Sequence, residues 1–204
     1  ASSIPLVTLG TFLLWFGWFG FNGFSQLAMG TFDDVNAISK IAVNTHLAGA
    51  AGTVTGAAIT RLLGGKTDIV MMLNGALAGL VAITAEPLTP GPITAMIIGS
   101  IGAVIMYFGT KMLEGFGIDD VVGAIPVHMF AGIFGTLVVP FTNADTSLGT
   151  QFVGTLSVVL FSFVLSYLVF MAMKVTIGLR ISKAAEKLGT DKAEVGVIAY
   201  SIRD

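Results

Sequence analysis

Two histidines are the residues of this sequence best able to move a proton within an apolar stretch. His128 lies in GAIPVHMFAGIFG (residues 123–135), two residues after Pro126, and His46 lies in VNTHLAG. A neutral imidazole has one donor and one acceptor nitrogen and titrates near neutral pH, so it can accept a proton and pass it on. Either histidine could instead be structural, bonded across to a neighbouring helix, and spacing alone does not choose between them.

Small residues surround both histidines at helical spacing, which would leave room beside each ring for a partner or a lumen. For His128 they are Ala124, Ala131, Gly132 and Gly135. For His46 they are Ala42, Gly49, Ala50 and Thr53. Pro126 also lacks an N–H, which frees the carbonyl of Val122 for a hydrogen bond from a substrate or a water.

A third candidate site lies in FLLWFGWFGFNGFS (residues 12–25). Trp18, Phe21 and Ser25 are spaced at i, i+3 and i+7, so a helix would place them on one face. Aromatic faces attract cations and a hydroxyl accepts a hydrogen bond, so this stripe suits a cation site. Packed or lipid-facing rings, including an interfacial aromatic belt, would give the same pattern.

Asp119 and Asp120 come directly before the apolar stretch that contains His128. The simplest prediction for Asp120 is an N-cap, whose carboxylate accepts hydrogen bonds from the open amides of the first turn. A direct role in moving a solute is less favoured, because both carboxylates would lie at a membrane interface.

The composition indicates that these candidates are positioned by helices in a bilayer. The chain is 54% hydrophobic and 11% charged, whereas soluble domains carry about 25% charged residues. Six apolar segments approach the roughly 17–25 residues that a spanning helix needs. They are Pro5–Ala28, Ala37–Leu63, Ile69–Ala85, Ile93–Leu113, Val121–Phe141 and Phe152–Ile177. We therefore expect an all-α membrane protein rather than a buried bundle within a large soluble protein.

The basic residues are sorted by side of the predicted membrane. With six spans both ends lie on one side, and that side holds nine of the ten basic residues; only Lys40 lies on the other. The nine are Arg61, Lys66, Lys111, Lys174, Arg180, Lys183, Lys187, Lys192 and Arg203. Cytoplasmic loops carry the Lys and Arg excess. Both ends of this segment are thus predicted to face the cytoplasm.

Several classes of function are disfavoured by what the sequence lacks. It has no cysteine, no basic stripe suited to nucleic acid, and no metal cluster, nucleophile constellation or cofactor loop. We expect no enzyme activity, no cofactor and no metal. The glycine pairs in GAAGTVTG and NGALAG are explained by close helix packing alone.

Long motifs of this chain resemble the later helices of the ammonium transporter family, which is related to the Rhesus glycoproteins. In order they are LGTFLLWFGWFGFNGFS, AVNTHLAGAAG, LNGALAGLVAITA, IDDVVGAIPVHMFAGIFGT and TIGLRIS. The family fold has eleven spanning helices, with two five-helix halves in an inverted repeat and a last long helix outside. The resemblance implies that the six segments are helices six to eleven, and that the first pore histidine and first gate phenylalanine belong to an earlier half.

The resemblance also implies roles for individual residues. Phe21 matches one of two stacked gate rings, Ser25 a hydroxyl at the outer ammonium site, and Trp18 a tryptophan below the gate. His128 matches the second of two pore histidines that bond to each other, and Asp120 matches a structural aspartate. His46 matches no pore histidine, which favours the structural interpretation for it.

The function implied is passage of ammonium or ammonia through an apolar pore with a histidine proton relay. The expected setting is the plasma (inner) membrane and its lipid, with residues 1–177 in the membrane and 178–204 as a cytoplasmic tail. Homotrimer assembly and a PII-type regulatory partner at the cytoplasmic side are also implied. The alternatives are an ammonium-sensing receptor and a truncated, non-conducting fragment.

Overall fold

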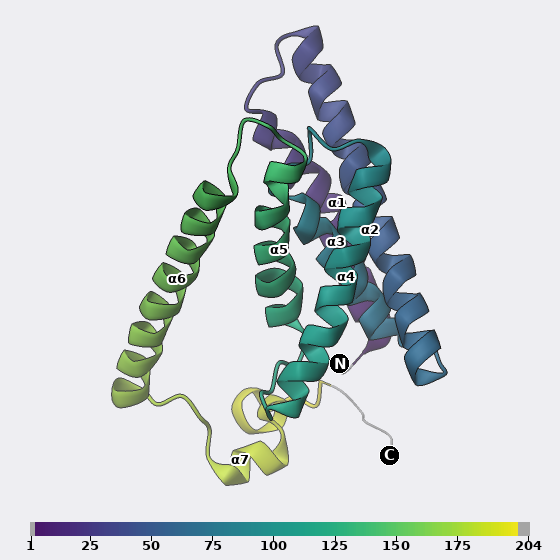
Figure 1. Ribbon diagram of the computed structural model, residues 1–204. Helices are drawn as coiled ribbons and strands as arrows, with labels where there is room; N and C mark the ends of the chain where they lie inside the picture. Colours follow the sequence, from purple (N-terminus) through teal and green to yellow (C-terminus); the bar gives the residue numbers. More distant parts are fainter. Residues whose placement is uncertain (1–2, 200–204) are drawn as a thin grey trace. The chain divides into compact units, whose positions relative to one another are not determined.

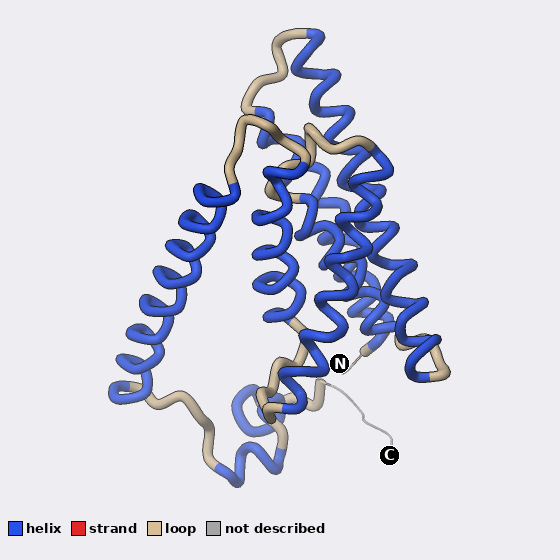
Figure 2. The backbone as a smooth tube through the Cα atoms, viewed as in Figure 1, coloured by secondary structure: helices blue, strands red, loops and turns tan. Residues whose placement is uncertain are grey.

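The computed structural model describes residues 3–199, and every regular element among them is helical (Figures 1 and 2). The helical prediction is thereby confirmed for these residues. The principal helices are α1 (Ile4–Gly23), α2 (Phe32–Gly64), α3 (Ile69–Ile83), α4 (Pro92–Gly115), α5 (Ala131–Val138), α6 (Leu148–Thr176) and α7 (Lys183–Leu188). The short elements are η1 (Phe24–Gln26), η2 (Ile125–Phe130), η3 (Val139–Phe141) and η4 (Asp191–Val195).

The chain divides into two units, one ending at Thr155 and the other beginning at Leu156, so the division falls within α6. The first unit contains α1 to α5 and all of the candidate site residues. In it α2, α3 and α4 run beside one another and form the central contacts (Figure 1).

The helices differ in how well they satisfy the length of a membrane span. Three are long and apolar enough by length and composition, namely Ile4–Gln26, Pro92–Gly115 and Leu148–Thr176. α3 has only 15 residues, fewer than the roughly 17 of a typical spanning helix. Among the described residues, three of the six predicted segments therefore qualify as membrane spans by length and composition, and the other three do not.

The second helix begins five residues before the predicted start at Ala37, because a capping box precedes it. The Thr31 hydroxyl accepts from the Asp34 backbone N–H at 3.1 Å. The Asp34 carboxylate in turn accepts from the Thr31 backbone N–H at 3.0 Å. This reciprocal pair satisfies two open amides and starts the helix at Phe32.

Glycines allow the backbones of α2 and α3 to touch, as their spacing predicted. A Cβ placed on Gly75 of α3 would lie 2.5 Å from the carbonyl oxygen of Gly52 on α2, and a Cβ on Gly52 would collide with the carbonyl oxygen of Gly75. A Cβ on Gly56 would lie 2.8 Å from the Met71 carbonyl oxygen. This backbone crossing, centred on Gly52 and Gly75, provides dispersion contacts where lipid removes the hydrophobic drive for association.

The tail of the second unit contains a short charged helix. α7 begins after Ser182, whose hydroxyl accepts from the Ala185 N–H at 3.2 Å, and its residues are mostly exposed. Hydrogen bonds from backbone amides, that of Ala199 first, hold the pKa of Asp191 below its ordinary value. Arg203 lies outside the described residues.

Candidate functional site

The predicted helix over Val121–Phe141 is interrupted around His128. Residues Ile125–Phe130 form the π-helical element η2, α5 continues to Val138, and η3 ends the segment. Prolines at 126 and 140 lie in the two irregular parts. Each proline removes a backbone donor and so disturbs the regular helical hydrogen bonding. A π-helical turn is a frequent feature of functional sites.

The wider turn separates His128 from two of the small residues that a regular helix would place beside it. Ala131 and Gly135 are buried against the core, whereas His128 and Ala124 are exposed in this unit. A π-helical turn takes more residues than an α-helical one, which changes the register of faces across it. The prediction that all these residues share one face with His128 is therefore wrong.

The core beneath His128 is made by its immediate neighbours. Val127 is 2% exposed and Ala131 is fully buried, and both belong to a cluster with residues of α3 and α4. The other buried members are Leu77, Ala78, Leu80 and Met106. The histidine ring thus projects from a turn whose opposite side is anchored in the core.

The carbonyl that Pro126 leaves without its helical donor is occupied by a side chain. Asn74 of α3 donates its Nδ2 hydrogen to the Val122 carbonyl oxygen at 3.0 Å. We had expected this carbonyl to be open to a substrate or a water. A residue 48 positions earlier in the chain thus supplies one donor to this oxygen. A carbonyl oxygen can accept two hydrogen bonds, so acceptance from a substrate or a water stays a prediction.

Asp120 satisfies the amides at the start of the same segment. Its Oδ1 accepts from the Ala124 N–H at 2.9 Å and its Oδ2 from the Ile125 N–H at 2.8 Å. Hydrogen bonds to an ionised acceptor are roughly twice as strong as neutral ones. Asp120 therefore binds the first turn of η2 with both carboxylate oxygens.

The N-cap of η2 is Ala124 and not Asp120, so the N-cap prediction is wrong in its position. Asp120→Ala is still expected to reduce the stability of the folded chain by about 1–3 kcal/mol, because it leaves the Ala124 and Ile125 amides without their acceptor. Asp119→Ala is the matched control, since its exposed neighbouring carboxylate has the same charge. Thermal unfolding in detergent, followed by tryptophan fluorescence, measures the difference. Equal melting temperatures for the two variants would contradict the capping role.

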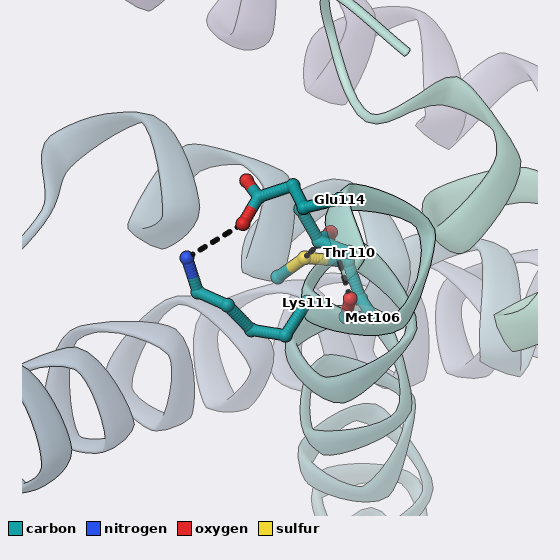
Figure 3. Close-up of polar contacts among 4 residues, drawn as sticks. All are labelled: Met106, Thr110, Lys111 and Glu114. Atoms are coloured by element: carbon teal, nitrogen blue, oxygen red, sulfur yellow. Dashed lines mark hydrogen bonds and ion pairs between the residues drawn. The ribbon is translucent and has the colours of Figure 1, made fainter. Parts of the chain in front are cut away.

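α4 supports η2 on another side. A Cβ on Gly109 would lie 2.5 Å from Phe130 Cδ2 and 3.3 Å from Pro126 Cβ, so only glycine allows these rings to approach. Near this point Thr110 donates to the Met106 carbonyl oxygen at 2.9 Å, and Lys111 pairs with Glu114 at 2.9 Å (Figure 3).

The aromatic stripe of α1 is only partly buried. The indole N–H of half-buried Trp18 donates to the Thr84 hydroxyl at 2.8 Å, which ties α1 to the end of α3. The Trp18 and Phe21 rings lie 5.8 Å apart, and Phe21 is 64% exposed. The exposed Ser25 hydroxyl donates to the Phe21 carbonyl oxygen at 3.2 Å.

His46 of α2 packs against aromatic rings of α1. Its exposed ring stacks on Phe19 with centroids 6.2 Å apart and meets Trp15 at 5.4 Å. Both rings come from α1, so this histidine packs across to the adjoining helix. The arrangement matches the structural interpretation of His46.

α3 is the element that relates the aromatic stripe to His128. It contacts both α1 and η2, while α1 and η2 share no backbone contact among the described residues. The Trp18 and Phe21 rings are neighbours, and Trp18 also packs against the core cluster that contains Val127, the residue before His128. Two polar residues that we did not predict make these connections. Asn74 of α3 donates to the Val122 carbonyl oxygen, and Thr84, directly after α3, accepts from the Trp18 indole. An asparagine within the apolar run LNGALAG was the available signal.

Comparison with known proteins decides the relationship. A sequence model described as the ammonium transporter family matches residues 1–200. The chain belongs to the ammonium transporter family. The resemblance that the motifs indicated is therefore confirmed.

Several relatives within this family are similar over nearly the whole chain. The ammonium transporter Amt2 of Archaeoglobus fulgidus is 40% identical over 219 residues, which cover 97% of this chain and 46% of the relative. The ammonium transporter Amt1 of Methanocaldococcus jannaschii is 35% identical, over 98% of this chain and 51% of the relative. The chain thus spans about half the length of these ammonium transporters.

Solved structures of the family share the fold. A structure titled sensor Amt protein superimposes with a TM-score of 0.86 at 34% identity, covering 94% of this chain and 49% of that one. The crystal structure of Candida albicans Mep2 gives a TM-score of 0.81 at 29% identity, covering 95% and 46%. Ammonium transporters are multi-pass membrane proteins, in agreement with the apolar helices found here.

Proposed function

We propose that these residues form the later half, helices six to eleven, of a protein that carries ammonium or ammonia across the plasma membrane. Family membership supports the substrate class. The half-length coverage of the relatives and the order of the motifs support the assignment to one half. Residues 1–177 would lie in the membrane, and residues 178–204 would form a cytoplasmic tail, with both ends of the segment in the cytoplasm as the Lys and Arg distribution favours.

The proposed mechanism avoids moving a bare charge through hydrocarbon, which costs about 3 kcal/mol or more. Ammonium first binds where the Phe21 ring and the Ser25 hydroxyl provide an aromatic face and an acceptor. After losing a proton, neutral ammonia passes through a narrow apolar lumen. Trp18 would line this path, and its hydrogen bond to Thr84 would hold the indole in place.

His128 would carry one half of the proton relay. Its ring projects from an anchored turn and is exposed on the open side of this unit, so it is available to a second histidine from the earlier half. An imidazole can accept a proton at one nitrogen while donating from the other. This exposed ring above a buried turn is the single observation that best supports the proposal.

Assembly and regulation follow the family. We propose a homotrimer in which each subunit has its own pore, and contact between the charged tail and a PII-type protein at the cytoplasmic side. The exposed residues of α7 make the tail available for such a contact. Asp120 would serve this machinery structurally, by capping the His128 segment.

Proteoliposomes that contain the polypeptide carrying these residues test the function. We expect saturable accumulation of methylammonium, inhibited by ammonium, and a signal absent from empty vesicles. Binding of ammonium without any flux would support the sensing alternative instead. If the vesicles show no binding of ammonium and no flux, the proposal is rejected and the non-conducting fragment is favoured.

A further inference from the structure

Pro126 creates a specific problem at the start of the His128 segment. In a regular helix the Val122 carbonyl would accept from the N–H of residue 126, which proline lacks. The next amide, that of Val127, donates to Gly123 at 3.1 Å and not to Val122. Backbone carbonyls that lose their helical donor are normally paired with another group, and a side chain provides that donor here.

Asn74 is built into α3 to supply that donor. Its side chain is 8% exposed, and its Nδ2 lies 3.0 Å from the Val122 oxygen. Gly123 adopts a φ of +74°, and a Cβ there would lie 2.7 Å from the same Nδ2. The proline, the glycine and the asparagine thus fit one another at a single point.

Two side chains therefore fix the first turn, one by accepting from its amides and one by donating to a carbonyl. Asp120 accepts from the Ala124 and Ile125 amides, and Asn74 donates to the Val122 carbonyl. The turn that follows is π-helical and directs Val127 inward and His128 outward. A change in how this turn starts would rotate the imidazole relative to the core.

We propose that Asn74 is a positioning residue for His128, because its hydrogen bond to the Val122 carbonyl sets the turn from which the imidazole projects. The expected effect of Asn74 on transport rests on the proposed function. Its expected effect on the position of the His128 ring does not. Asn74 touches neither the solute nor the imidazole in this proposal. It acts through the backbone between Val122 and His128.

Asn74→Leu removes the donor and keeps the number and branching of the side-chain heavy atoms, and Asn74→Asp keeps the shape but replaces the donor with an acceptor. The chain offers a close control in Asn44, a fully buried asparagine of α2. Asn44 donates to the Pro87 and Pro90 carbonyl oxygens, each at 2.9 Å, in the loop between α3 and α4. Asn44→Leu removes both of these bonds without touching η2.

The readout is the ¹⁵N NMR signal of the His128 ring in the polypeptide that contains these residues, assigned by its loss in His128→Ala. We expect both Asn74 variants to shift the ring nitrogens, and Asn44→Leu to leave them unchanged even if it melts earlier. Methylammonium uptake per folded protein should fall about tenfold or more in the Asn74 variants, as misplacing a reacting group by about 1 Å can do. If Asn74→Leu does not fold, Asn74→Asp provides the same measurement.

Unshifted ring signals in a folded Asn74 variant whose stability falls like that of Asn44→Leu would overturn the proposal and leave a purely structural hydrogen bond. Shifted ring signals with unchanged uptake would instead uphold the positioning role and count against His128 in transport. The two ideas therefore fail in different ways.

Discussion

Gly52→Leu is expected to prevent α2 and α3 from packing, with a loss of stability of at least about 3 kcal/mol. Overpacking a core commonly costs about 1–3 kcal/mol when side chains can adjust. Here the group that a new Cβ would strike is the carbonyl oxygen of Gly75, so only a backbone shift could relieve the clash. α3 would move, and with it the contacts of Asn74 and Thr84.

Gly17→Leu is the matched control, because a Cβ on Gly17 of α1 would meet nothing within 4 Å. The yield of monodisperse protein and the melting temperature, measured by fluorescence-detected size exclusion after heating, compare the two. We expect near-normal behaviour for Gly17→Leu and little or no folded protein for Gly52→Leu. Similar melting curves for both variants would show that the backbone crossing is not as tight as described.

His128→Ala is expected to lower methylammonium uptake on the order of 100-fold, since general acid–base groups contribute about 10²–10⁴-fold where a proton must move. Alanine retains the helix but has no titratable nitrogen. Initial rates in proteoliposomes, normalised to the amount of folded protein, provide the measurement. The predicted loss concerns transport and not folding, because the His128 ring is exposed in this unit.

His46→Ala serves as its control. Both histidines are exposed, but the His46 ring stacks on Phe19 and Trp15 of α1. We expect its replacement to alter stability slightly and to leave the uptake rate unchanged. A larger loss for His46→Ala than for His128→Ala would reverse the assignment of the two residues.

The sequence was most informative where a property depends on neighbours along the chain. Hydrophobic runs located α1 to α6, and the glycine pairs around Gly52 and Gly75 predicted a close crossing. The early start of α2 was missed because Thr31 and Asp34 look like loop residues until their reciprocal bonds are seen. That signal was present in the sequence as a capping-box pattern.

The site was less predictable because its decisive contacts are long-range. The sequence showed that Pro126 would free a carbonyl, but not that Asn74, 48 residues away, would bond to it. Helical spacing grouped Trp18 with Ser25, whereas Trp18 is held by Thr84, 66 residues away. It also grouped His128 with Ala131, since a regular period does not anticipate a π-helical turn.

The backbone crossing of α2 and α3 has a consequence for motion. Two helices whose main chains already touch cannot slide or roll against each other without steric overlap, and α4 is joined to them because a Cβ on Gly102 would lie 2.8 Å from the Ala78 carbonyl oxygen. These three helices should therefore move as one rigid body. In the proposed function, opening and closing of a passage would then come from ring rotations on α1, such as that of Phe21, or from displacement of elements outside this trio.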